Sequence, residues 1–205
     1  MEKNMKTLEY ILKKYEVRSD KNSFIVELPK SRWSDYPVLL AELGMNKGVE
    51  IGVYKGKFSY ILKKYNPKLD LIGVDPWNVY GEYKDYTEDE LENEAYHQAK
   101  IRADKYGITL MRAWSMDAVK EFKDESLDFV FIDGNHDFEH VVEDVAKWSC
   151  KVRKGGIVSG HDFIKNEKRK FGVKEAVTAW CESYQIQPLF VFMGDGCPTW
   201  MYVKQ

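Results

Sequence analysis

The chain has 205 residues and a formal net charge of −2 at pH 7. Its length fits one ordinary domain, and its charge gives no general attraction to nucleic acid or anionic membranes. We therefore expect no specific nucleic-acid partner and no membrane partner. The three cysteines are widely spaced and match neither a disulfide framework nor a zinc motif. No stretch approaches the roughly 20 apolar residues of a membrane span, and the charged N-terminus lacks the apolar centre of a signal peptide. These features predict a cytoplasmic protein.

The first 46 residues are predicted to form an N-terminal helical segment packed on a core made by residues 47–205. Apolar side chains recur at helical spacing from Leu8 to Tyr15, which indicates an amphipathic helix. This helix packs either on its own domain or on a second subunit of a homodimer. The stretch "FIVELP" (24–29) is either a short strand or an extended connector. A second helix is expected to end at Gly44, a favourable C-terminal cap.

From residue 48 onward, apolar strands alternate with helical patterns. Such alternation predicts an α/β fold with a doubly wound, mostly parallel sheet covered on both faces. The last two strands are joined by a turn without a helix, so that pair is most easily antiparallel. Ligands of such sheets bind beyond the carboxyl ends of the strands, where the strand order reverses. The expected strands are 48–53, 70–77, 108–114, 127–134, 155–163, 188–194 and 199–204.

The first of these strands runs into the turn "EIGVYKG", which contains Glu50, Gly52 and Gly56. Its G-x-x-x-G spacing differs from the G-x-G-x-x-G dinucleotide fingerprint and from the phosphate loop. By itself the turn fits a tight connection and a nucleotide loop equally well. Asp75 ends the next strand, about 20 residues further on, where a carboxylate accepts hydrogen bonds from ribose hydroxyls. The alternative for Asp75 is a turn-forming role before Pro76.

Aromatic and hydroxyl side chains follow the second and third strands. Trp77 offers an apolar face to a base or a substrate, and Trp114 with Ser115 can flank an adenine. Ser115 equally fits the cap of the short helix that follows it. We also place Ser59, in the helix after the glycine turn, in the expected cofactor site. The stretch 76–99, which carries Tyr80, Tyr83 and Tyr86, is predicted to form an aromatic lid or a locally packed surface loop.

The densest polar cluster, "FIDGNHDFEH", follows the fourth strand and contains Asp133 and His136. The fifth strand ends in "GHDF", with His161 and Asp162. Because neighbouring parallel strands end at one edge of a sheet, the two carboxylates should converge. Two carboxylates with a histidine suit a divalent cation such as Mg²⁺ that keeps open water positions.

Taken together, "FIDGNHDFEHVVEDVAKW" and "GGIVSGHDF" after the glycine turn resemble the class I S-adenosylmethionine-dependent methyltransferases. Within them the chain is similar to methyltransferase family 24, a small-molecule O-methyltransferase branch. The resemblance implies a Rossmann-like sheet of seven strands with the last one antiparallel. It also implies that Glu50, Gly52 and Gly56 line the methionine and ribose part of the cofactor. Asp75 would hold the ribose diol, and Trp114 and Ser115 would lie beside the adenine.

The resemblance further implies that Asp133 and Asp162 occupy metal-ligand positions, with Asp133 also reaching the cofactor. His161 stands where relatives commonly have another acidic or amide residue, so it is a metal ligand, a general base or a hydrogen-bond partner. The expected activity is methyl transfer from S-adenosylmethionine to a hydroxyl of a small molecule or glycan, with His136 or His161 taking the proton. The competing classes are a NAD-dependent Rossmann-type oxidoreductase and a non-catalytic binding protein with this fold.

Overall fold

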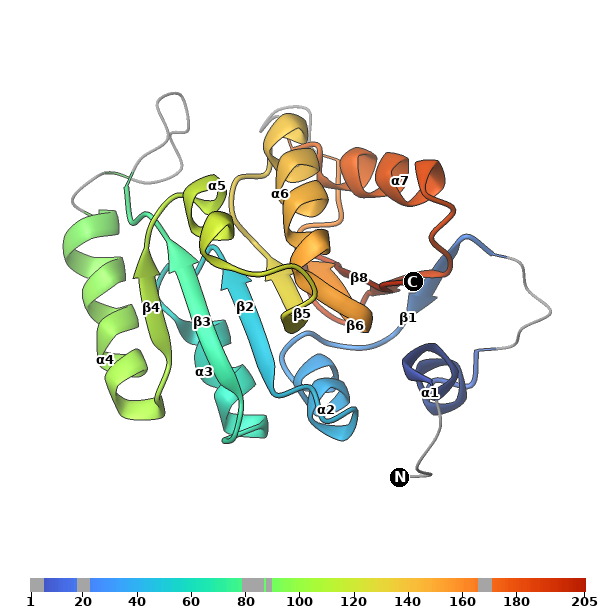
Figure 1. Cartoon of the computed structure of the whole chain (residues 1–205), viewed down its shortest axis with the longest axis horizontal. Coiled ribbons are helices and arrows are strands. Elements are labelled where there is room, and N and C mark those ends of the chain that lie inside the picture. Colours follow the sequence, from blue (N-terminus) through green and yellow to red (C-terminus); the bar gives the residue numbers. More distant parts are fainter. Residues whose placement is uncertain (1–5, 18–22, 79–86, 88–89, 166–170) are drawn as a thin grey trace.

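The computed structural model describes residues 6–17, 23–78, 87, 90–165 and 171–205. One eight-stranded sheet runs through the molecule in the order β1-β7-β8-β6-β5-β2-β3-β4 (Figure 1). The strands are β1 (Ile25–Leu28), β2 (Lys47–Ile51), β3 (Asp70–Asp75), β4 (Thr109–Arg112), β5 (Leu127–Ile132), β6 (Val152–Gly160), β7 (Leu189–Phe192) and β8 (Thr199–Val203). All neighbours are parallel except β8, which is antiparallel to β6 and β7. The predicted fold class is confirmed, with one strand more than expected.

The additional strand is β1, which comes from "FIVELP" and pairs in parallel with β7. The N-terminal segment therefore supplies an edge strand as well as two helices. Its first helix packs on its own chain: Ile11 is fully buried, and the rings of Tyr15 and Phe192 lie 5.7 Å apart. The hydroxyl of Thr7 donates a hydrogen bond of 2.6 Å to the carbonyl of Gly155. Of the two placements considered for this helix, the structure shows the first.

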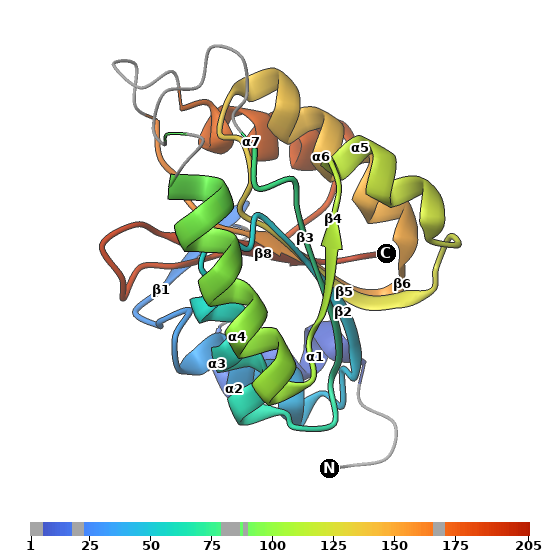
Figure 2. The ribbon, with the colours of Figure 1, turned by 90° about the vertical axis from the view of Figure 1, so that its left-hand side faces the viewer.

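Two helical layers cover the sheet, as Figure 2 shows from the side. One face carries α1 (Thr7–Lys14), α2 (Asp35–Glu42), α3 (Lys57–Tyr65) and α4 (Tyr96–Tyr106), and the other carries α5 (Ser115–Ala118), α6 (Phe138–Lys151) and α7 (Val173–Ser183). A π-helical turn, η1 (Glu90–Ala95), leads into α4, and a 3-10 turn, η2 (Val119–Glu121), follows α5. None of the helices in the described ranges is long and apolar enough to cross a membrane.

The central strand β5 shows why both faces need a cover. Phe129 and Phe131 belong to the apolar cluster under α1 to α4, whereas Val130 and Ile132 belong to the cluster under α5 to α7. Since side chains alternate along a strand, the uninterrupted apolar run from Phe129 to Ile132 buries this part of the strand on both faces. Strand order reverses between β2 and β5, and a ligand crevice is expected at that point.

Candidate active site at the carboxyl edge of the sheet

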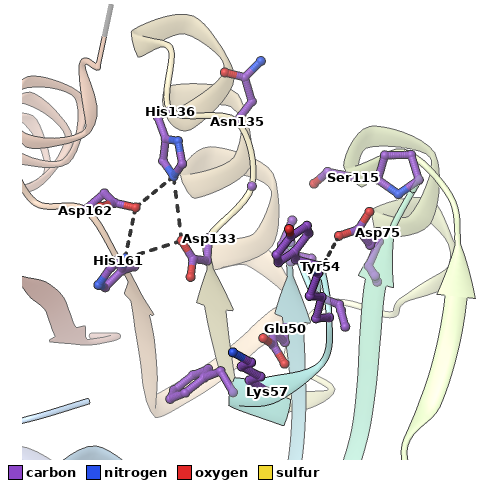
Figure 3. A pocket seen from close by; sticks show the side chains of 18 of the residues that line it. Glu50, Tyr54, Lys57, Asp75, Ser115, Asp133, Asn135, His136, His161 and Asp162 are labelled. Atoms are coloured by element: carbon purple, nitrogen blue, oxygen red, sulfur yellow. Dashed lines mark hydrogen bonds and ion pairs between the residues drawn. The ribbon is translucent and has the colours of Figure 1, made fainter. Parts of the chain in front are cut away.

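A cavity of about 380 Å³ opens at this reversal point (Figure 3). Its walls come from the ends of five strands, so residues far apart in the chain share one space. Of the residues predicted for the cofactor and the chemistry, seven line it: Glu50, Gly52, Asp75, Ser115, Asp133, His136 and His161, together with the predicted metal ligand Asp162. Gly56, Ser59, Trp77 and Trp114 are not among the lining residues.

The glycine turn brings the backbone of β2 against the end of β5. Gly52 has φ +85°, and a Cβ there would lie 2.0 Å from the carbonyl oxygen of Asp133. Gly56 has φ +70°, and a Cβ there would lie 3.2 Å from the Cα of Ala99 in α4. Glycine adopts this backbone region without steric cost, so both positions favour it. Gly52 thus forms part of the cavity floor, while Gly56 allows α3 and α4 to approach each other.

Glu50 is a buried carboxyl group with 1% of its surface exposed. Burial raises its pKa to about 8, and a short hydrogen bond from the hydroxyl of Ser59 opposes that rise. Ser59 is itself buried. Its expected contact with the cofactor is corrected here, because its hydroxyl is used to hold Glu50 from behind the cavity wall.

Asp75 ends β3 and faces the cavity. Its carboxylate accepts hydrogen bonds from the backbone N–H of Tyr54 at 2.8 Å and of Trp77 at 2.7 Å. Burial raises the pKa of Asp75, and these N–H groups oppose the rise. A carboxylate oxygen has more than one lone pair, so both oxygens keep capacity for a ligand. The backbone therefore fixes the position of the Asp75 carboxylate beside the cavity.

Trp77 does not present its ring to the cavity, which corrects the expectation of a contact with a base. The side chain is 1% exposed, and its ring lies 4.9 Å from that of Tyr96. Its indole N–H donates to the carbonyl of Tyr54 at 2.8 Å. A tryptophan that buries its ring must also pair its N–H, and here both needs are met inside the wall. The predicted lid, with Tyr80, Tyr83 and Tyr86, lies outside the described residues.

Ser115 reaches the cavity from the start of α5, whereas Trp114 precedes that helix and is half-buried outside the lining residues. The hydroxyl of Ser115 donates a short hydrogen bond to Asp144 and accepts one of 2.8 Å from the indole of Trp148. Burial raises the pKa of Asp144 to about 7. Sequence reasoning missed Asp144. Its position between Val141 and Val145, on the apolar face of α6, could have indicated a buried carboxylate.

An acid–histidine cluster forms the opposite end of the cavity (Figure 3). Nε2 of His136 lies 3.0 Å from Asp162 and 3.7 Å from Asp133. Nδ1 of His161 lies 3.0 Å from Asp162 and 3.7 Å from Asp133. Burial alone would lower the pKa of His136, but the two carboxylates outweigh it and raise that pKa to about 9. The histidines hold the pKa of Asp162 well below its usual range, despite burial.

Donor atoms of Asp133, His136 and Asp162 all lie within 4.8 Å of one another and could hold a metal ion. The predicted set contained His161 in place of His136. His161 has similar access to the carboxylates, because its Nδ1 lies 3.0 Å from Asp162 and 3.7 Å from Asp133, while its Nε2 lies 3.1 Å from the carbonyl oxygen of Cys197. Two carboxylates with one imidazole fit a divalent cation. The imidazole nitrogen makes this ligand set better suited to a transition metal than the all-oxygen sites that Mg²⁺ prefers.

Arg32 completes the cluster and was missed by sequence reasoning. Its guanidinium donates a hydrogen bond of 2.9 Å to Oδ2 of Asp133. Its backbone N–H donates to the carboxylate of Asp195 at 2.6 Å, which ties the segment between β1 and α2 to the turn between β7 and β8. Its guanidinium also lies 4.5 Å from the ring of Trp33. Burial raises the pKa of Asp133, but His136, His161 and Arg32 outweigh it and lower that pKa.

The strand order and the cavity at its reversal define a doubly wound α/β protein of the methyltransferase type. A family model described as a methyltransferase domain, methyltransferase family 24, matches residues 49–163. The match covers more than half of the chain, so the chain belongs to this family of class I S-adenosylmethionine-dependent methyltransferases. The predicted family is confirmed. Membership favours methyl transfer over the nicotinamide-dependent alternative.

Solved structures share the fold at low sequence identity. The chain is similar to a putative caffeoyl-CoA O-methyltransferase from Staphylococcus aureus, with TM-score 0.65, 10% identity and coverage of 98% of this chain and 93% of that one. It is also similar to an O-methyltransferase from Bacillus cereus in complex with SAH, with TM-score 0.61, 15% identity and coverage of 97% and 90%. An uncharacterized protein of Acanthamoeba polyphaga mimivirus is 28% identical over 120 residues, which span 56% of this chain and 50% of that protein.

Proposed function

We propose that the protein transfers a methyl group from S-adenosylmethionine to a hydroxyl oxygen of a small-molecule or glycan acceptor. One observation carries the proposal: the acid–histidine cluster opens into the same cavity as Glu50, Gly52 and Asp75. A donor half and a proton-accepting half therefore face each other across one space. The O-methyltransferases among the structural neighbours support the oxygen acceptor.

The donor half consists of chain groups suited to a nucleoside with an amino-acid tail. Asp75, fixed by two backbone N–H groups, accepts from the ribose diol. Gly52 lines the cavity at the end of β2, and Ser115 borders the position proposed for the adenine. When bound, S-adenosylmethionine supplies an electrophilic methyl group on a sulfonium leaving group. The protein therefore has mainly to align the hydroxyl with that carbon and accept its proton.

The acceptor half is the cluster of Asp133, His136, His161 and Asp162. The nitrogen–oxygen distances within the cluster are 3.0–3.7 Å, so its members titrate together. The raised pKa of about 9 keeps the proton on His136 at neutral pH, and we therefore assign the proton-accepting role to the cluster as a unit in its deprotonated state. A divalent cation held by Asp133, His136 and Asp162 would supply a Lewis acid that lowers the pKa of the acceptor hydroxyl. Arg32 keeps a fixed positive charge beside the site and favours the alkoxide that develops there.

Calorimetric titration with S-adenosylhomocysteine tests the donor half without knowledge of the acceptor. We expect binding to wild type and a loss of about tenfold or more in Asp75→Ala, since hydrogen bonds to a charged group contribute about 1.5–3 kcal/mol. Asp70→Ala is the matched control, because Asp70 is an exposed aspartate at the amino end of the same strand. Equal affinities for wild type and Asp75→Ala would refute the donor site. Mass spectrometry of the purified protein for retained S-adenosylhomocysteine is an independent check.

A further inference from the structure

A second hollow of about 620 Å³ adjoins the cavity and lies between α3 and α4. We call it the α3–α4 groove. Trp33 and Lys57 line both spaces, so the groove continues from the proposed active site. Figure 3 shows Lys57 beside the cavity, on the side of Glu50. Nothing in the donor or acceptor half described above uses the groove.

The groove is both cationic and aromatic. Lys57, Arg102 and Lys105 line it, and among the described residues no carboxylate does. Arg102 donates to the backbone carbonyls of Lys55 at 2.8 Å and Gln98 at 3.1 Å. These neutral carbonyls position the guanidinium without cancelling its charge. The one acidic side chain of α4, Asp104, does not line the groove and pairs with Lys100 at 3.2 Å.

Apolar surface lies next to these cations. Trp33 is 38% exposed and Ile101 is 54% exposed, and these two large apolar side chains line the same groove. The rings of Tyr60 and Tyr106 lie 4.6 Å apart and form one wall. Exposed apolar surface gathered with positive charge, with no carboxylate lining the groove in the part of the chain that the structure describes, indicates a ligand that has an apolar or aromatic body and an anionic group.

We propose that the methyl acceptor carries a carboxylate or phosphate, and that the α3–α4 groove holds this anionic part while the hydroxyl enters the cavity past Lys57. The proposal rests on the proposed function and adds the chemical class of the acceptor. A nucleic acid is disfavoured, because a strand needs a continuous positive track for successive phosphates. Here the three cations are confined to one groove of a chain whose net charge is −2.

The test compares three fluorescent aromatic probes, namely 1-naphthyl phosphate, 1-naphthoate and neutral 1-naphthol, by titration with and without saturating S-adenosylhomocysteine. We expect at least one anionic probe to bind about tenfold more tightly than naphthol, a difference of about 1.4 kcal/mol. The stronger of the two anions tells a phosphate from a carboxylate. Equal affinity for anionic and neutral probes would overturn the proposal.

Lys105→Glu is the diagnostic variant, since Lys105 lines only the groove and is exposed. We expect it to weaken the anionic probe about tenfold and to leave naphthol unchanged, with Lys105→Gln giving a smaller loss. Lys64→Glu, on the exposed last turn of α3, makes the same charge change outside the groove and should have no effect. Equal losses in both charge-reversed variants would attribute the binding to net charge and overturn the proposal.

Two further measurements separate the outcomes. A single-stranded RNA oligonucleotide that binds more tightly than the anionic probes, and that Lys64→Glu weakens as much as Lys105→Glu, would replace the small-molecule acceptor with nucleic acid. Titration with S-adenosylhomocysteine on the same samples reports the cofactor site independently. If the protein binds the anionic probe but not S-adenosylhomocysteine, the proposed function is refuted and the anion site remains. If it binds S-adenosylhomocysteine but not the anionic probe, the anion site alone is refuted.

Discussion

Asp144 offers the sharpest test of the electrostatics around the cavity. Its carboxyl group is 5% exposed and accepts a hydrogen bond from Ser115, and burial raises its pKa from 3.8 to about 7. A folded-state pKa above the unfolded value means that the folded protein binds this proton more tightly. The stabilising contribution is therefore fully present below about pH 4 and is lost as the pH rises through about 7.

The magnitude follows from the shift. About three pKa units at 1.36 kcal/mol each amount to about 4 kcal/mol of lost stability well above the folded pKa. About 3 kcal/mol of that loss falls between about pH 5 and about pH 8. Asp144→Asn removes the titration but keeps an oxygen that accepts the hydrogen bond from Ser115. The variant should thus lose less stability than wild type over the same interval.

Urea unfolding followed by circular dichroism at about pH 5 and about pH 8 measures both free energies of unfolding. We expect Asp144→Asn to gain about 3 kcal/mol relative to wild type between the two values. Asp104→Asn, an exposed aspartate on α4, controls for the loss of a charge and should follow wild type. Parallel pH profiles for wild type and Asp144→Asn would refute the reasoning, because they would mean that Asp144 ionises without a burial cost.

Three further outcomes are expected. Gly52→Ala should lower the free energy of unfolding by about 3 kcal/mol in urea, because the new Cβ would lie 2.0 Å from the carbonyl oxygen of Asp133. An unchanged urea midpoint would contradict the close approach of Gly52 to that carbonyl. If a divalent cation assists the reaction, EDTA and Asp162→Ala should each lower methyl transfer about tenfold or more, and added metal should restore only the wild type; unchanged activity in both would reject the cation. Trp77→Phe should lower the free energy of unfolding by about 1–3 kcal/mol, because the carbonyl of Tyr54 loses the indole N–H that it accepts. A change near zero would mean that water hydrogen-bonds this carbonyl instead.

Much of the site could be predicted because local pattern and sheet topology agree. Glu50, Asp75, Asp133 and Asp162 each come at or just after the end of an apolar strand. In a parallel sheet such ends gather at one edge whatever the details of the helices. The order of strands and helices along the chain could also be predicted, because the spacing of apolar residues in a helix differs clearly from that in a strand. The extra edge strand β1 was open between two interpretations because a short apolar stretch has no period of its own.

The orientation of side chains and the contacts between residues far apart in the chain could not be predicted from the sequence. An aromatic residue at a strand end can face a ligand or the core, and Trp77 faces the core because its backbone N–H and its indole are both bound within the wall. Arg32, which reaches the cluster, is bound through its backbone N–H to Asp195, 163 residues further along the chain. No spacing rule connects two such positions. The contact between Nε2 of His161 and the carbonyl of Cys197 joins positions 36 residues apart and was equally hidden from spacing rules.

The two carboxylate oxygens of Asp133 have different partners in the cluster. Oδ2 is bound by Arg32 at 2.9 Å, while Oδ1 faces His136 and His161, each at 3.7 Å. A cation held by Asp133, His136 and Asp162 would supply Lewis acidity, and the guanidinium of Arg32 engages Asp133 without it. Arg32 then balances one carboxylate permanently, and the histidines or a cation balance the rest. In the reaction that we propose, an acceptor hydroxyl that loses its proton would meet a positive charge already held in place by Arg32, and this preorganisation would lower the cost of forming the alkoxide.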